Sequence, residues 1–175
     1  MRSATVAAPR VQRGEVRWEL SRGGASFVFR RIAPQLLLLI VRGIDRGQLG
    51  LAPIEEIRSQ IDLDGSLQLF VDAKGAIAVW PEVTREWTRF IWQERRRLGP
   101  VSVLVGSRAV GLAIEVAQAL DRTGRVVQIH SDEDRFLRKL DEARERLAPG
   151  CAQRQEGRGA TRTGAASALP VPPAP

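Results

Sequence analysis

Apolar runs separated by polar, glycine-marked breaks begin near residue 15, and their spacing predicts strands at the start of the fold. The segments "VRWEL" (16–20) and "ASFVFRR" (25–31) flank "SRGG", a pattern typical of a β-hairpin. The apolar run "QLLLLIVRG" (35–43) predicts a third strand. The chain therefore opens with hairpin strands.

Helical spacing then alternates with short apolar runs. Residues 53–61 begin with Pro and space Ile54, Ile57 and Ile61 as a helix does. The other predicted elements are strands at 66–73, 101–106 and 125–130, and helices at 81–98, at 108–122 and from 131–134 onward, the last with Phe136, Leu137, Leu140 and Leu147 on one side. This order predicts an α/β fold with a mixed sheet, four helices, and a parallel portion joined by right-handed crossovers.

The folded domain is expected to span residues 14–148. Residues 1–13 and 149–175 lack apolar periodicity, and the second segment is rich in Ala, Gly, Pro and Arg, so both are predicted to be disordered. The longest apolar run, at 36–41, is too short to span a bilayer, so no membrane insertion is expected. The N-terminus has no apolar stretch of signal-peptide length, which makes the cytoplasm the expected location.

The net charge of +7 is carried mainly by the ends of the chain. Residues 1–14 hold three arginines and no acid, and residues 151–175 hold three arginines and one glutamate. The domain itself is nearly balanced, so no nucleic-acid partner is expected. Cys151 and His130 are the single cysteine and histidine, which argues against a cysteine-based metal cluster or a disulfide within the chain. No cofactor or metal is predicted.

The segment 101–140, "VSVLVGSRAVGLAIEVAQALDRTGRVVQIHSDEDRFLRKL", has a buried strand, a helix ending "L-x-x-T-G", a strand, and an acidic helix start. Together with "LQLFVDAKGAIAV" before it, this order of elements resembles the STAS domain of sulfate transporter tails and anti-sigma factor antagonists. The resemblance covers about residues 15–145, and the extra opening strands are similar to a divergent, STAS-like branch found in bacteria. It implies a domain that acts by binding in signal transduction.

The resemblance also implies where a phosphorylation switch would lie. In the antagonist family a strand ends in Asp, a short loop follows, and an Asp-Ser-Ser-Gly corner opens a helix whose second serine is phosphorylated. Laid on that pattern without gaps, Asp72 and Gly75 match the strand end and the loop, while the corner falls on "WPEV" (80–83). Glu82 then replaces the serine, so no standard serine switch is expected.

Two interpretations of Glu82 stay open. It is either a fixed negative charge that imitates the phosphorylated state, or an acid favoured in a first turn by the helix dipole. Thr84 is the nearest hydroxyl and is the candidate for a displaced phosphosite.

A helical wheel over residues 81–98 separates the tryptophans. Val83, Trp87, Phe90, Ile91 and Leu98 form a core stripe, whereas Trp92 falls on the other side beside Arg85, Arg89 and Arg96. Trp92 is either part of a partner surface, since Trp and Arg are enriched at binding hot spots, or a surface ring covered by arginines. The candidate partner-binding residues are Trp80, Glu82, Thr84, Arg85, Arg89, Trp92 and Arg96.

The sequence thus predicts a non-catalytic regulatory module for protein–protein interaction, without the standard serine phospho-switch. The resemblance implies an anti-sigma factor or a regulatory kinase as the partner. The alternative is a STAS-like sensor of a small ligand, a lipid or a nucleotide. An exposed surface around Trp92 without a deep cavity favours the protein partner, and an enclosed apolar pocket favours the ligand.

Overall fold

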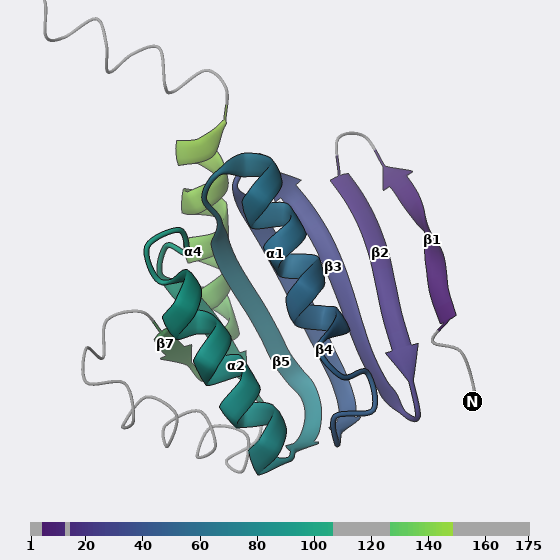
Figure 1. Ribbon diagram of the computed structural model, residues 1–175. Helices are drawn as coiled ribbons and strands as arrows, with labels where there is room; N and C mark the ends of the chain where they lie inside the picture. The colour runs from purple at the N-terminus through teal and green to yellow at the C-terminus, as the bar shows by residue number, and fades with distance from the viewer. Residues whose placement is uncertain (1–4, 13–14, 107–126, 149–175) are drawn as a thin grey trace, which may run out of the picture.

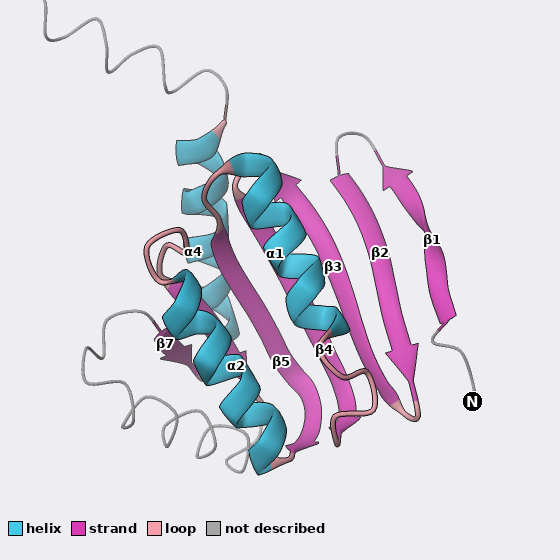
Figure 2. Cartoon of the chain, viewed as in Figure 1, coloured by secondary structure: helices cyan, strands magenta, loops and turns pink. Residues whose placement is uncertain are grey.

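The computed structural model describes residues 5–12, 15–106 and 127–148, which form one seven-stranded mixed sheet with helices on both faces (Figures 1 and 2). The strands lie in chain order: β1 (Thr5–Gln12), β2 (Glu15–Arg22), β3 (Ala25–Ala33), β4 (Leu36–Asp45), β5 (Gln68–Val79), β6 (Val101–Val105) and β7 (Val127–His130). The first four strands pair antiparallel, and β4 to β7 pair parallel.

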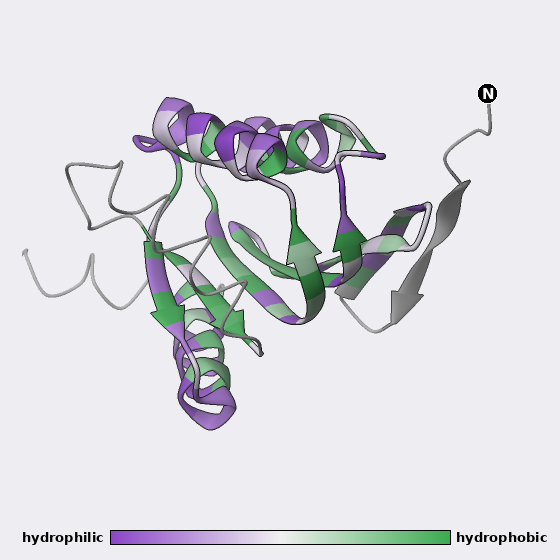
Figure 3. Ribbon diagram, turned by 90° about the horizontal axis from the view of Figure 1, so that it is seen from below, coloured by the Kyte–Doolittle hydropathy of each residue, from purple (hydrophilic) through white to green (hydrophobic). Residues whose placement is uncertain are grey.

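Helices α1 (Ala52–Asp64) and α2 (Pro81–Glu94) cover one face of the sheet, and α4 (Glu133–Leu147) covers the other (Figures 1 and 3). In Figure 1 the parallel strands run downward, α1 and α2 lie in front, and each following strand lies to the left. The crossovers through α1 and α2 are therefore right-handed, as the sequence predicted, whereas the predicted crossover from β6 to β7 lies outside the described residues.

The predicted α/β class and the parallel portion are confirmed. The strands predicted at 66–73 and 101–106 pair in parallel, and the described part of the third, β7, pairs in parallel with β6. The predicted helix at 108–122 and the tail at 149–175 lie outside the described residues. The N-terminal prediction differs from the structure, because Thr5–Gln12 forms the edge strand β1 instead of a disordered segment.

Strand β5 is longer than its apolar run predicted. The sequence placed its end near Asp72, but the strand continues to Val79. Only Phe70 to Ala73 pair with β6, whereas the second half pairs with β4 up to the Val79–Asp45 pair, through two register shifts. This polar half of the strand is held by pairing with β4, which is distant in the sequence. A local sequence pattern does not reveal such pairing.

Strand β4 is buried on both faces, and its alternate side chains pack in two separate cores. Leu37, Leu39 and Val41 belong to the cluster beneath α1 and α2, whereas Leu36 and Leu38 pack with α4. Figure 3 shows the apolar faces of the helices turned toward the sheet. The prediction for the last helix is wrong at one position: Leu137 is exposed, while Phe136 and Leu140 are buried.

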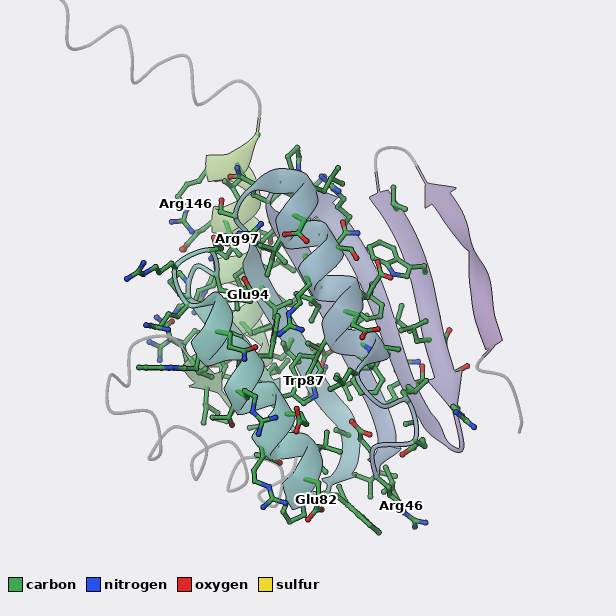
Figure 4. The ribbon with its side chains drawn as sticks, viewed as in Figure 1. Arg46, Glu82, Trp87, Glu94, Arg97 and Arg146 are labelled. Carbon is green, nitrogen blue, oxygen red and sulfur yellow. The ribbon has the colours of Figure 1, made fainter. Side chains whose placement is uncertain are left out.

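Polar contacts join the carboxyl-terminal parts of α1 and α2. Arg97 donates through Nη2 to the carbonyl of Ile61 (3.1 Å) and to Asp62 Oδ1 (2.8 Å), and so caps α1 from the turn after α2 (Figure 4). Arg58 donates to Gln93 Oε1 (2.7 Å) and lies 3.4 Å from Glu94. These contacts fix the spacing of the two helices at their carboxyl-terminal ends.

The closest backbone approach that a substitution can test lies between β3 and β4. Gly43 has a φ of +83°, and a Cβ there would stand 1.8 Å from the carbonyl oxygen of Gly24. Gly24 has a similar φ of +85°, but a Cβ added to it meets nothing within 4 Å. The pair therefore separates backbone strain from steric overlap.

We expect Gly24→Ala to cost roughly 1–2 kcal/mol, the usual cost of a left-handed conformation. Gly43→Ala should cost roughly 2 kcal/mol more, since it adds overpacking to the same strain. Chemical denaturation of both variants measures the difference. Equal costs would mean that β3 and β4 do not approach as closely as the structure shows.

Candidate functional site

A cleft of about 460 Å³ opens at the carboxyl edge of the parallel strands, between the β4–α1 loop and the first turns of α2. Buried or half-buried apolar side chains line its interior: Leu49, Pro53, Ile54, Val83 and Trp87. Charged side chains surround it: Asp45, Arg46, Glu82, Arg85, Glu86 and Arg89. In Figure 4, Arg46 and Glu82 lie near its lower end and Trp87 lies between the two helices.

Asp45, the last residue of β4, contributes a buried carboxyl group to this cleft, since only 6% of the residue is exposed. Its Oδ1 accepts a hydrogen bond from the backbone N–H of Gly47 (2.9 Å). Burial raises the pKa of Asp45 and outweighs that hydrogen bond, which lowers it. Among the described residues no cation lies within ion-pair distance of this carboxyl group.

The acids and bases on α2 are already paired with each other. Arg85 contacts Glu82 and Arg89 contacts Glu86, each at 3.1 Å one turn apart. These side chains are exposed, so each pair adds little to stability. Arg46 differs, because its guanidinium carbon lies 6.0 Å from the ring centre of Trp80 and it makes no ion pair in the described part of the chain.

The Trp-Pro-Glu corner follows β5 directly. Trp80 is the extended N-cap residue of α2, Pro81 occupies the first turn, and no side chain caps the helix. The N–H of Trp80 donates to the carbonyl of Asp45 (3.0 Å), which fixes the start of α2 to the end of β4. The side chain of Trp80 is 49% exposed, while the Thr84 hydroxyl donates to the carbonyl of Trp80 (3.3 Å).

The strand before this corner differs from the pattern of the antagonist family. The antagonist pattern has a loop between the strand-end Asp and the helix, whereas β5 runs unbroken past Asp72 and Gly75 to Val79. Asp72 lies within the strand, and its Oδ1 accepts from the N–H of Lys74 (3.0 Å). The match of Asp72 to a strand end and of Gly75 to a loop is therefore wrong.

Trp92 is exposed as predicted, with 47% of its surface accessible, but its arginine neighbour is different. The guanidinium carbon of Arg95 lies 4.1 Å from the ring centre of Trp92, and Arg95 also donates to the Trp92 carbonyl (2.6 Å). The helix ends at Glu94, so the wheel that placed Arg96 beside Trp92 extended beyond the helix. Arg85 and Arg89 bond to glutamates instead of stacking on the indole.

Trp87 packs on the core as predicted. Its ring lies nearly parallel to that of Phe27, with 6.4 Å between centres, and edge-on to Phe90 at 6.1 Å. It is half-buried and also lines the cleft.

The structure thus brings Glu82, Arg85 and Arg89 to the cleft, with Trp80 at the corner beside it, and leaves Trp92 outside its lining. Sequence reasoning missed Asp45 and Arg46. The available signal was an acid that directly follows an apolar strand and precedes a glycine turn, in "GIDRG".

His130 ends β7 beside the second core. It is buried, its ring lies edge-on to Phe136 at 6.0 Å, and its Nε2 has no hydrogen-bond partner among the described residues. Burial, followed by the charges of Lys139 and Arg135, lowers the pKa of His130. Across the described ranges, no group of three or more His, Cys, Asp or Glu side chains is placed to hold a metal ion.

A scan against models of protein families finds none that matches this chain, and a search of curated proteins also finds no match. No helix in the described residues is long and apolar enough to cross a membrane.

The two tryptophans of α2 should respond differently to truncation. Trp87→Ala removes a ring packed on Phe27 and Phe90 and should cost roughly 3 kcal/mol of unfolding free energy. Trp92→Ala removes one exposed cation–π contact and should cost about 1 kcal/mol or less. Denaturant titration measures the free energy of unfolding of both variants. Equal losses would mean that the Trp92 ring is buried in a core as the Trp87 ring is.

Asp45→Asn should stabilise the protein at neutral pH. Asn keeps an acceptor for the Gly47 N–H and removes a charge whose burial is unfavourable. Because the pKa of Asp45 is raised on folding, the ionised group destabilises the fold at every pH above both pKa values, and this loss disappears below the ordinary pKa of Asp, about 3.9. Unfolding measured at neutral pH and near pH 3 should show the advantage of Asn only at neutral pH; a variant less stable at neutral pH would contradict it.

Proposed function

We propose that this protein is a non-catalytic binding module that recognises a protein partner through the exposed side of α2. The observation that carries the proposal is the half-exposed Trp92 ring stacked on Arg95, next to the arginine–glutamate pairs of the same helix. Trp and Arg are the side chains most enriched at hot spots of protein interfaces. The contact with Arg95 also holds the indole in place before any partner arrives, which reduces the ordering cost of binding.

The inner side of the same helix explains why α2 can serve as a binding element. Phe90 is buried and Trp87 packs on Phe27, so the helix is anchored to the sheet by large rings. Its exposed side chains are therefore presented on a rigid support, and substitutions there leave the core contacts intact.

The alternative is a sensor of a small ligand. The cleft beside Asp45 favours it, since a volume of about 460 Å³ lies within the usual range of ligand pockets. The cleft is open and has charged side chains around it, however, and does not form the enclosed apolar pocket that a lipid would need. We therefore rank a protein partner first.

We also propose that the fold is a divergent STAS-like domain that acts in regulation, with an anti-sigma factor or a regulatory kinase as the partner. The order of hairpin strands followed by strand–helix units supports this relationship. The missing loop after Asp72, and a helix start at "WPEV" (80–83) that contains no serine, argue against the standard serine phospho-switch of that family.

The test compares two exposed apolar residues on opposite faces of the molecule. Trp92→Ala should weaken partner binding by on the order of 2 kcal/mol, as hot-spot truncations do. Leu137→Ala, on α4, truncates a side chain of similar exposure and should leave binding unchanged. A partner is first identified from native lysate by its loss with the Trp92 variant alone, and the affinity of each variant for the purified partner is then measured by calorimetry.

The proposal fails if every protein enriched by the unmodified chain is retained by the Trp92 variant. Circular dichroism of both variants serves as the folding control.

A further inference from the structure

We propose that the cleft between the β4–α1 loop and α2 receives a lysine or arginine side chain of the protein partner, held by the carboxylate of Asp45. This inference rests on the proposed function and names the chemistry that the partner must bring. It is carried by three observations at one place: a buried acid that pairs with no cation of the described residues, an apolar lining, and charges on α2 that are already balanced.

The buried acid is the first observation. A carboxylate removed from water is costly unless a cation or several donors compensate it. Among the described residues Asp45 has one hydrogen-bond donor, the N–H of Gly47, and only 6% of the residue is exposed. A cationic group that enters the cleft would supply the missing compensation, and its attraction to a largely buried carboxylate would be stronger than between two groups in open water.

The apolar lining is the second observation. Leu49 and Ile54 on one side and Trp87 on the other are suited to the aliphatic stem of a lysine or arginine. Such side chains bury their methylene groups on apolar surface and place only the charged end against a polar group. A guanidinium or ammonium group can also lie against an indole face.

The charges around the cleft are the third observation. Glu82 pairs with Arg85, and Glu86 pairs with Arg89, so these four side chains present little net field to an entering group. Arg46 lies over the Trp80 ring at 6.0 Å. An anion at the same place would be repelled by the Asp45 carboxylate, whereas a cation would compensate its charge.

The structural role of Asp45 in its turn is the competing explanation, and the chain contains a control for it. Asp72 makes the same local contact, from Oδ1 to the N–H of the residue two positions on, at 3.0 Å, and it does not line the cleft. Asp45→Asn and Asp72→Asn both keep an acceptor for that contact and remove one charge. Only the first should affect binding of a cation in the cleft.

The experiment uses the full chain labelled with ¹⁵N and four probes that each have a four-carbon chain: n-butylammonium, n-butylguanidinium, n-butanol and butyrate. The reporter is the indole N–H signal of Trp87, assigned by its loss in Trp87→Phe. We expect the two cations to shift this signal to saturation and the alcohol and butyrate to leave it unchanged. The affinity for the cations should fall at least about thirtyfold in Asp45→Asn, the lower end of the effect of removing one member of a buried charge pair, and should be unchanged in Asp72→Asn.

Three results would overturn the inference: saturation by butyrate or butanol equal to that by the cations, no saturation by either cation, or equal cation affinity in the Asp45 variant. The first of these with butyrate would identify an anion site, and with butanol an apolar ligand pocket. None of them affects the test with Trp92, which reports on the outer side of α2. If the cations bind through Asp45 and the Trp92 variant keeps every partner, the cleft chemistry stands and the proposed interface does not.

Discussion

The parallel pairing of β4 with β5 is the constraint on which the rest of the molecule depends. At β4 the sheet changes from antiparallel to parallel pairing, and its leucines supply both cores, Leu37 and Leu39 to one and Leu36 and Leu38 to the other. Because β5 follows β4 as far as the Val79–Asp45 pair, the next residue, Trp80, donates its N–H to the Asp45 carbonyl. A shorter pairing would release both the start of α2 and the end of β4.

The cleft follows from that pairing. Asp45 ends one strand where α2 begins after the other, so the β4–α1 loop and the first turns of α2 must face each other across the sheet edge. At the far ends of the helices, Arg97 and Arg58 join α1 to the end of α2 and the turn that follows it. The helices are thus held together at one end and share a cleft at the other, where Trp87 packs on Phe27 and limits how deep the cleft can be.

Local patterns predicted the elements well and their lengths poorly. The class, the order of strands and helices and the crossovers followed from apolar runs and helical spacing, because burial on one or two faces leaves that signature. The second half of β5 and strand β1 carry no such run, since both depend on pairing with a neighbour strand. The same limit affected the site: Arg95, not Arg96, stacks on Trp92 because the helix ends at Glu94, and a wheel cannot show where a helix ends. Asp45 was missed because its burial depends on a loop and a helix that meet only in three dimensions.

The opening of α2 also bears on the two interpretations of Glu82. A fixed charge that imitates a phosphoryl group must be presented to a partner without compensation, and a phosphoryl group carries about −1.5 to −2. Glu82 carries less than that, and its Oε1 accepts from Arg85 at 3.1 Å within the same helix. Since both side chains are exposed, the pair is weak and a partner could open it, but in the free protein the two charges largely cancel at a distance. The position in the first turn of a helix that no side chain caps gives an acid there a sufficient local reason. The structure therefore favours the helix-dipole interpretation of Glu82, and among the described residues it leaves the buried Asp45, not the corner, as the acid of the cleft that makes no ion pair.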